Sequence, residues 1–266
     1  MEPSSVPRWH LPMLRSEVPF PAAAIPRPAI EHAAGMLRAE VVATERLVAG
    51  LGAVAWEVAA THDQALPDLV AAMILDLEEV GRNRRLLDPP WQATVTDAYR
   101  QRRARALARV PPARLAAELS CWGHQAALAV LGGGRRGPAS HFQARAAAGL
   151  TADYLFRVLL PRQAWLRRGD ITQAARQPLT PGPHGPEVIR QALRDLADAW
   201  RGPPVLVEVT GPPAGRWLVG TGTAVARVRA GPFGIVRDLT RGAAGAVAIA
   251  GDEAVASALL RTRVPG

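Results

Sequence analysis

Apolar positions recur at helical spacing through the first two thirds of the chain. After Pro28 they lie three or four residues apart as far as Val48, where Gly50 and Gly52 end the run. The same spacing predicts further helices over 68–87, 91–110, 113–131 and about 142–176. Proline pairs and a glycine-rich loop over 132–137 separate these helices. Because no strand-like alternation interrupts the runs, this part is predicted to be an all-α bundle.

Beyond a proline-rich linker at 178–186, the pattern becomes that of a mixed domain. Ala226 and Val228 alternate with Arg227 and Arg229, which is typical of a strand with one buried face. The predicted elements are, in chain order, a helix over 187–200, strands over 205–210, 216–219 and 224–230, a helix over 232–241, a strand over 246–250 and a last helix capped by Asp252. Together they predict a small α+β domain with an antiparallel or mixed sheet.

The N-terminal residues are rich in proline and follow no period, so an extended arm is predicted, packed on the body through Trp9 and Phe20. The predicted domains are the arm over 1–28, the helical bundle over 29–177 and the α+β domain over 178–266. No apolar run reaches the roughly 18–20 residues of a membrane span, and the N-terminus lacks the apolar core of a signal peptide. We expect a cytoplasmic protein with no membrane partner.

Composition excludes several kinds of chemistry. Cys121 is the single cysteine, so an intramolecular disulfide and any CxxC motif are excluded, and we expect its thiol to be buried in the core. The chain has no lysine, which excludes P-loop and Schiff-base lysines. The net charge of +9 raises the possibility of nucleic-acid binding. The densest arginine run, over 100–109, spreads around most of a helix, so we expect a solvated helix and no nucleic-acid partner.

Several short motifs occur in an order that resembles a known family. The segment WLRRGDITQA begins at Trp165 and is followed by Gln177-Pro178-Leu179; Asp68-Leu69-Val70-Ala71 and Trp56 lie upstream, and VEVTGP and VAIAGD lie downstream. Over about residues 30–265, this order resembles the mycothiol-dependent maleylpyruvate isomerase-like family of the DinB superfamily. The resemblance implies a DinB-like four-helix bundle that holds a divalent metal in its core, followed by a small α+β C-terminal domain.

The positions of the family's metal ligands carry unsuitable residues here. In the family, a histidine on the second helix and an acid and a histidine four residues apart on the last helix hold the ion. Those positions correspond to Ala72, Gln163 and Arg167. Alanine has no donor atom, an amide oxygen is a poor ligand for a transition metal, and arginine stays cationic. We therefore predict no metal and no other cofactor, with mycothiol dependence left open.

Arg167 is the expected replacement for the metal. Asp76 and Glu79 share a helix face with Ala72, and Arg167 should reach Asp76 across the bundle. In one interpretation this pair only fills the core, or Arg167 extends to solvent. In the other, Arg167 and Gln163 bind a carboxylate, enolate or other oxyanion in a pocket lined by Trp165 and Met73.

Histidines supply the candidates for general acid–base chemistry. His124 and His141 flank the glycine-rich loop, and His62 lies in the loop before the second helix, where the family's pocket would open. For each of them the alternative is a histidine that is merely exposed or satisfied by neighbours. Asp170, near the end of a predicted helix, is expected to be a structural hydrogen-bonding residue.

The leading hypothesis is a metal-independent isomerase, cyclase or thiol-transferase-like enzyme of specialised metabolism. It would act on a small anionic or carbonyl-bearing metabolite, as a monomer or homodimer. The alternative is a non-catalytic small-molecule-binding or regulatory protein on the same scaffold. A weaker third hypothesis, duplex DNA binding through the 100–109 helix, would give a steeply salt-dependent affinity.

Overall fold

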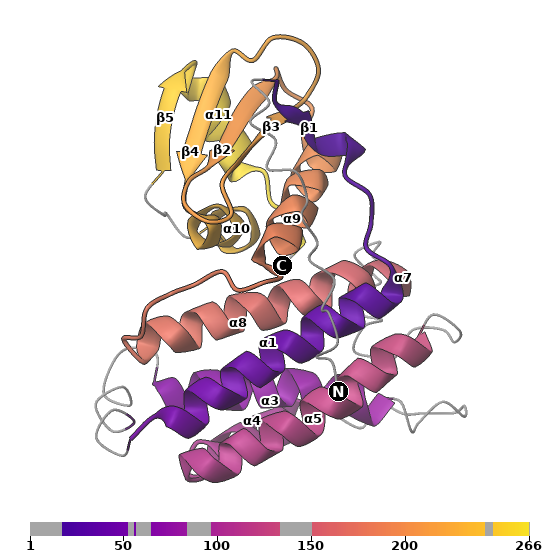
Figure 1. The fold of residues 1–266 in the computed structure, drawn as a ribbon, viewed down its shortest axis with the longest axis vertical. Coiled ribbons are helices and arrows are strands. Elements are labelled where there is room, and N and C mark those ends of the chain that lie inside the picture. Colours follow the sequence, from indigo (N-terminus) through magenta and orange to yellow (C-terminus); the bar gives the residue numbers. More distant parts are fainter. Residues whose placement is uncertain are drawn as a thin grey trace, which may run out of the picture.

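The chain forms a helical part and a sheet-containing part, one above the other in Figure 1. The computed structural model describes residues 18–52, 56, 65–83, 97–133, 151–242 and 247–265. The architecture expected from the hydrophobic pattern, a mainly helical unit followed by a small α+β unit with a mixed sheet, is confirmed. No described helix is both long and apolar enough to cross a membrane.

The helical part is built from α1 (Ile30–Gly50), α3 (Leu66–Asn83), α4 (Asp97–Leu107), α5 (Pro112–Gly133) and α8 (Leu160–Ala174). Helices α1, α3, α5 and α8 pack on one another, and α4 lies against α3 (Figure 1). Buried side chains such as Leu37, Val70 and Leu119 form their common core, because each helix turns one apolar stripe inward. The predicted helical runs are confirmed where the structure describes them.

A wider helical turn interrupts the long helix expected over 142–176. After the short α7 (Ala152–Tyr154), residues Leu155–Leu159 form a π-helical turn, and α8 begins directly after it. Pro161 explains the change, since it has no backbone N–H to continue the α-helical ladder and is accommodated in the first turn of α8.

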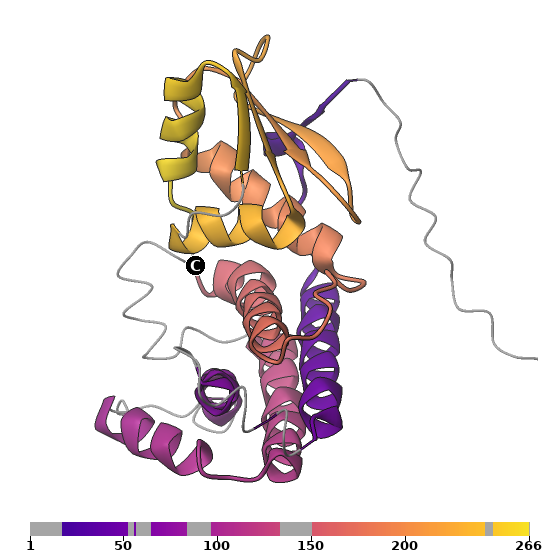
Figure 2. The ribbon, with the colours of Figure 1, turned by 90° about the vertical axis from the view of Figure 1, so that its left-hand side faces the viewer.

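The sheet has the strand order β1-β3-β2-β4-β5 and is mixed. Its strands are β1 (Phe20–Pro21), β2 (Val205–Val209), β3 (Gly215–Val219), β4 (Ala226–Ala230) and β5 (Val247–Gly251). Helices α9 (Gly185–Ala199) and α11 (Glu253–Arg261) lie on one face of the sheet (Figure 2), and α10 (Pro232–Arg241) packs against both helices. Val207 and Val228 point to this covered face and are fully buried, whereas Arg227 and Arg229 point to the open face, as the alternation predicts.

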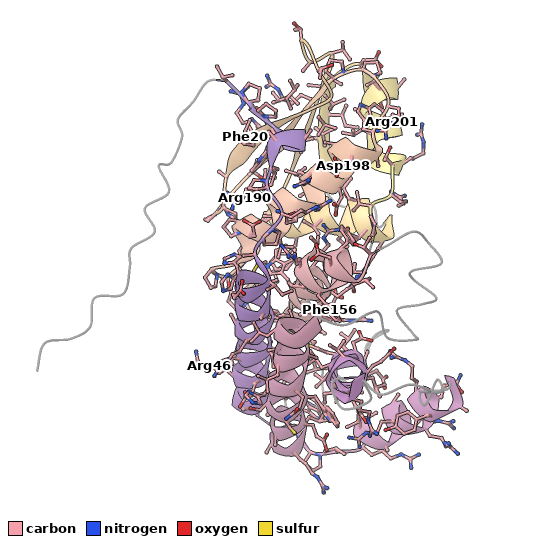
Figure 3. The ribbon with its side chains drawn as sticks, turned by 90° about the vertical axis from the view of Figure 1, so that its right-hand side faces the viewer. Phe20, Arg46, Phe156, Arg190, Asp198 and Arg201 are labelled. Carbon is pink, nitrogen blue, oxygen red and sulfur yellow. The ribbon has the colours of Figure 1, made fainter. Side chains whose placement is uncertain are left out.

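The N-terminal arm joins the sheet although it is almost two hundred residues away in sequence. Its strand β1 pairs in parallel with Trp217 and Leu218 of β3, and a 3₁₀ turn (Ala22–Ala24) follows it against α9. The expectation that Trp9 and Phe20 anchor the arm is corrected for Phe20. Phe20 is 43% exposed (Figure 3), and Ala22 and Ile25 are the buried contacts, while Trp9 lies outside the described residues.

A buried ionic cluster joins the arm, the helical part and the sheet part. Asp195 of α9 accepts hydrogen bonds from Arg27 Nη1 at 2.6 Å, Arg162 Nη2 at 2.5 Å and the Tyr154 hydroxyl at 2.6 Å. Arg162 is 1% exposed and also donates to the Pro265 carbonyl. Burial, together with the Asp195 charge, raises the pKa of Tyr154, so its hydroxyl remains a donor.

Candidate functional site

A cluster of two carboxylates and two arginines lies where α3, α4 and α8 meet. Asp76 and Glu79 are three residues apart on α3 and therefore face the same side. Arg100 of α4 binds both of them, with Nη2 2.8 Å from Asp76 Oδ1 and Nη1 2.5 Å from Glu79 Oε2. Arg167 of α8 approaches from the other side of Asp76. We call these four residues the Arg167 cluster.

Arg100 is the closest cationic partner of both carboxylates in this cluster. Burial alone lowers the pKa of Arg100, but its hydrogen bonds and charge interactions with Asp76 and Glu79 outweigh burial and raise it. Glu79 is buried, so its carboxylate depends on such a partner. Arg100 was not predicted as a site residue, because an arginine run around a helix does not reveal which arginine faces the neighbouring helix.

Among the described residues, Arg167 has weaker contacts than Arg100. Its Nε lies 3.8 Å from Asp76 Oδ2, which is within ion-pair range but beyond a hydrogen bond. The same Nε atom is buried and has no hydrogen-bond partner among the residues that the structure describes. Both side chains are partly open to solvent, at 29% for Arg167 and 34% for Asp76. The expected approach of Arg167 to Asp76 is therefore observed, without a closed pair.

The other predicted neighbours of Arg167 are distributed around this cluster. Gln163 and Ala72 lie one helical turn before Arg167 and Asp76, respectively, and both are half-buried. Met73 is 1% exposed and belongs to the apolar core of the helical part. Its side chain therefore packs in the core and does not line a pocket at the surface of the cluster, contrary to expectation.

Trp165 is placed away from the Arg167 cluster, which corrects the expectation that it lines the same pocket. Two residues apart on a helix, Trp165 and Arg167 face nearly opposite directions. The Trp165 ring is fully buried against the sheet part, where it stacks on Phe233 at a centroid distance of 3.9 Å. Its indole N–H donates to the Pro181 carbonyl at 2.7 Å. Trp165 therefore connects α8 with α10 through ring stacking and with the linker through a hydrogen bond.

A second ionic network continues from the cluster along α4. Glu78 is buried and accepts hydrogen bonds from the Tyr99 hydroxyl, Arg82 and Arg103, and Arg103 also pairs with Glu118 of α5. Burial raises the pKa of Glu78, but these hydrogen bonds outweigh it and the pKa is lowered. The arginine run over 100–109 is thus only partly solvated, because Arg100 and Arg103 face α3.

The predicted acid–base residues receive little support. His62 and His141 lie outside the described residues, and His124 is exposed on α5. Cys121 is also exposed, so the expectation of a buried thiol is wrong. It lies on the side of α5 opposite Leu119, which faces the core. Asp170 is structural, as expected, since it accepts hydrogen bonds from Arg237 and Arg241 of α10.

A buried pair between α1 and α8 was not predicted. Arg168 Nε lies 2.5 Å from Glu40 Oε2, and both side chains are buried. Burial outweighs the attraction of Arg168 and raises the pKa of Glu40. Arg168 also donates to the Thr180 and Pro181 carbonyls of the linker. Glu40 is an acidic residue on the apolar helix face that Leu37 and Val41 define, and this position in the sequence could have indicated a buried partner.

Comparison with known proteins supports a distant structural relationship. No protein-family description and no curated protein matches the chain. A crystal structure of a histidine-to-alanine mutant of mycothiol-dependent maleylpyruvate isomerase is similar, with a TM-score of 0.53 and 13% sequence identity. A second crystal structure of mycothiol-dependent maleylpyruvate isomerase gives 0.51 and 14%. Each comparison covers 84% of this chain and 93% of the other. At this identity the likeness establishes the fold alone.

Proposed function

We propose that the protein is an enzyme on a DinB-like four-helix scaffold in which Arg167 binds the anionic or carbonyl oxygen of a small metabolite. The observation that carries the proposal is the state of Arg167. Arg100 already occupies the carboxylates beside it, while the Arg167 guanidinium stays partly exposed and has a buried Nε without a hydrogen-bond partner in the described part of the chain. A charged planar donor in this state is suited to a carboxylate or enolate oxygen.

The donor set argues for chemistry without a metal in the bundle. Ala72, Gln163 and Arg167 offer no strong ligand at the positions that bind metal in the resembled family. The nearest carboxylates, Asp76 and Glu79, are engaged by Arg100. Within the described residues, no three His, Cys, Asp or Glu side chains lie close enough together to hold an ion. A divalent cation would also meet two guanidinium charges here, so the residues do not fit it.

In this proposal Arg167 stabilises the negative charge that develops on a substrate oxygen during isomerisation, cyclisation or group transfer. A fixed donor contributes most where charge increases in the transition state, and loss of one such donor typically lowers kcat about 10²–10³-fold. Asp76, 3.8 Å away, would orient the guanidinium without neutralising it through a hydrogen bond. His62 and His141 remain predicted acid–base groups on the sequence argument alone.

The same ion pair favours an alternative in which Arg167 and Asp76 only fill the core of the scaffold and bind no ligand. If the contact of Arg167 with Asp76 is only structural, replacing either residue should lower stability and leave ligand binding unchanged. The two possibilities therefore differ in whether an Arg167 variant that still folds binds the ligand more weakly.

The test compares Arg167→Gln with Arg46→Gln, an exposed arginine of α1 that projects from the helix in Figure 3. Pyruvate, maleate and fumarate serve as carboxylate probes in calorimetric titrations, with and without mycothiol, on which the structurally similar isomerases depend. We expect Arg167→Gln to weaken binding of the best probe about tenfold to a hundredfold, and Arg46→Gln to leave it unchanged. Equal binding by both variants, or stoichiometric zinc in the purified protein by elemental analysis, would contradict the proposal.

A further inference from the structure

Strand β5 is the edge strand of the sheet that the described residues form. Within the described residues it pairs with β4 and with no other strand. Its sequence, VAIAG, contains no charged residue and no proline, and four of its five residues are exposed. Sheet edges in natural proteins are usually protected by charges, proline or a covering element, because their unpaired backbone groups bind other strands. In the part of the chain that the structure describes, Val247–Gly251 has none of those features.

The register identifies which backbone groups of β5 are available. Asp252 donates its N–H to the carbonyl of Val225, the residue directly before β4, at 3.0 Å. Hydrogen-bonded and non-hydrogen-bonded pairs alternate along an antiparallel ladder, so Ala250 and Ala248 also bond to β4. The N–H and C=O groups of Ile249 then point away from β4, toward the free edge. A strand added there would find donors and acceptors at the correct spacing.

The open face beside this edge carries an excess of positive charge. Arg216 of β3 and Arg227 and Arg229 of β4 surround the carboxylate of Glu208, at 3.1, 3.8 and 3.3 Å. Arg227 and Arg229 are 49% and 57% exposed, and the single Glu208 carboxylate that they share cannot neutralise both guanidinium groups. The open face is therefore selective for negative charge.

Two of these arginines lie within reach of a strand added at β5. Arg229 and Arg227 stand directly opposite Ala248 and Ala250 in the register. In the structure both arginines pair with Glu208 of β2, on the other side of β4, so they would have to turn toward the edge to meet an added strand. The alanine side chains are too short to block that movement. An added strand would lie roughly 10 Å from β4, two interstrand spacings, which an arginine and a glutamate side chain together can span.

We propose that the β5 edge binds an extended acidic segment of a partner protein by strand addition. The segment's backbone pairs with Ile249, and its acidic side chains lie over Ala248 and Ala250 toward Arg229 and Arg227. Nucleic acid fits less well, because Trp217, the single aromatic residue in β2–β5, pairs with the inward-facing Val207 and so lies on the covered face. A second copy fits less well too, because antiparallel β5 pairing would bring both sets of arginines onto the same face.

The test measures fluorescence anisotropy of a labelled peptide that alternates glutamate and valine, bound to the full chain. Control probes are a lysine–valine peptide, a glutamate–proline peptide of equal charge and a single-stranded RNA. We expect only the glutamate–valine peptide to bind, with an affinity that falls as salt increases. Comparable binding of the proline peptide or the RNA, or no binding of the glutamate–valine peptide, would overturn the proposal.

Matched variants separate the backbone contribution from the charge contribution. Ile249→Pro removes the outward N–H and should weaken binding about tenfold or more, whereas Ile249→Ala keeps that N–H and should change affinity less than about threefold. Arg227→Gln with Arg229→Gln should weaken binding about tenfold, and Arg46→Gln should leave it unchanged. Circular dichroism verifies the fold of Ile249→Pro. If it is misfolded, the arginine variants decide the outcome. Unchanged binding in the arginine variants would contradict the proposal.

Discussion

At the residue scale, the stability of this protein depends on buried charges that are each shared by several partners. Asp195 accepts hydrogen bonds from three different segments, and Glu78 accepts them from α3 and α4. A shared carboxylate of this kind is costly to remove, because its loss leaves buried guanidinium groups without compensation. Arg162, at 1% exposure, is the clearest example.

Replacing Asp195 tests this dependence. Asp195→Ala is expected to lower the free energy of unfolding by about 3–5 kcal/mol, because it leaves the buried Arg162 charge without its carboxylate partner. Asp198→Ala, on the same helix but 52% exposed, is the matched control and should cost less than about 1 kcal/mol. Urea unfolding followed by circular dichroism measures both. Equal losses would mean that the Asp195 cluster has no special role.

Glu78 gives a prediction for acid pH. Its folded-state pKa is lowered from 4.5, so its contribution to stability is present above that pH and is lost as the pH falls through the folded pKa. We expect Glu78→Gln to destabilise the protein at neutral pH and to make stability less dependent on pH below about 4.5. Urea midpoints measured at a series of pH values test this. An unchanged acid slope in Glu78→Gln would contradict it.

At the scale of elements, close helix contacts depend on small residues at particular positions. Gly123 of α5 faces α1, and a methyl group at this position would overlap the Val41 side chain. Gly35 of α1, in contrast, has open space around the position of a Cβ atom. The same substitution should therefore have opposite effects at the two sites.

Gly123→Ala is expected to lower the unfolding free energy by about 1–3 kcal/mol through overpacking, even though alanine favours a helix more than glycine does. Gly35→Ala is expected to raise it by about 0.5–1 kcal/mol, because only helix propensity changes. Thermal and urea unfolding of the two variants provide the measurement. Stabilisation by Gly123→Ala would show that α1 and α5 lie farther apart.

At the scale of the whole molecule, segments distant in sequence hold the two parts together. The N-terminal arm adds a strand to the sheet, Arg27 reaches α9, and Trp165 stacks on α10. The linker is fixed as well, because Arg168 donates to two of its carbonyls. The helical and sheet parts therefore share packing and charge contacts over a wide region.

The arm's contribution can be measured with two substitutions. Ile25→Ala removes a side chain that is 2% exposed in the sheet part and should cost about 2–4 kcal/mol. Phe20→Ala changes a larger but partly exposed side chain and should cost less than about 1 kcal/mol. Urea unfolding compares the two. A larger loss in Phe20→Ala would mean that the arm is anchored through its aromatic ring.

The sequence by itself determined the local elements and their inward faces. Helical spacing located α1, α3 and α5, and the alternation of Arg227 and Arg229 with Ala226 and Val228 identified both faces of β4. Asp252 was recognised as a helix cap, and its Oδ1 accepts the Val255 N–H. These features depend on residues close together in the chain, whose periodicity and side-chain chemistry are sufficient to predict them.

Only the tertiary structure decided which partners these faces meet. Whether Arg100 or another arginine of α4 neutralises Asp76, and whether Trp165 faces the bundle or Phe233, depends on how separate helices are rotated and placed. The pairing of Phe20 with Trp217 likewise joins opposite ends of the chain. Such choices follow from long-range packing and charge compensation, which are shared among distant segments and leave no local periodic signal in any one of them.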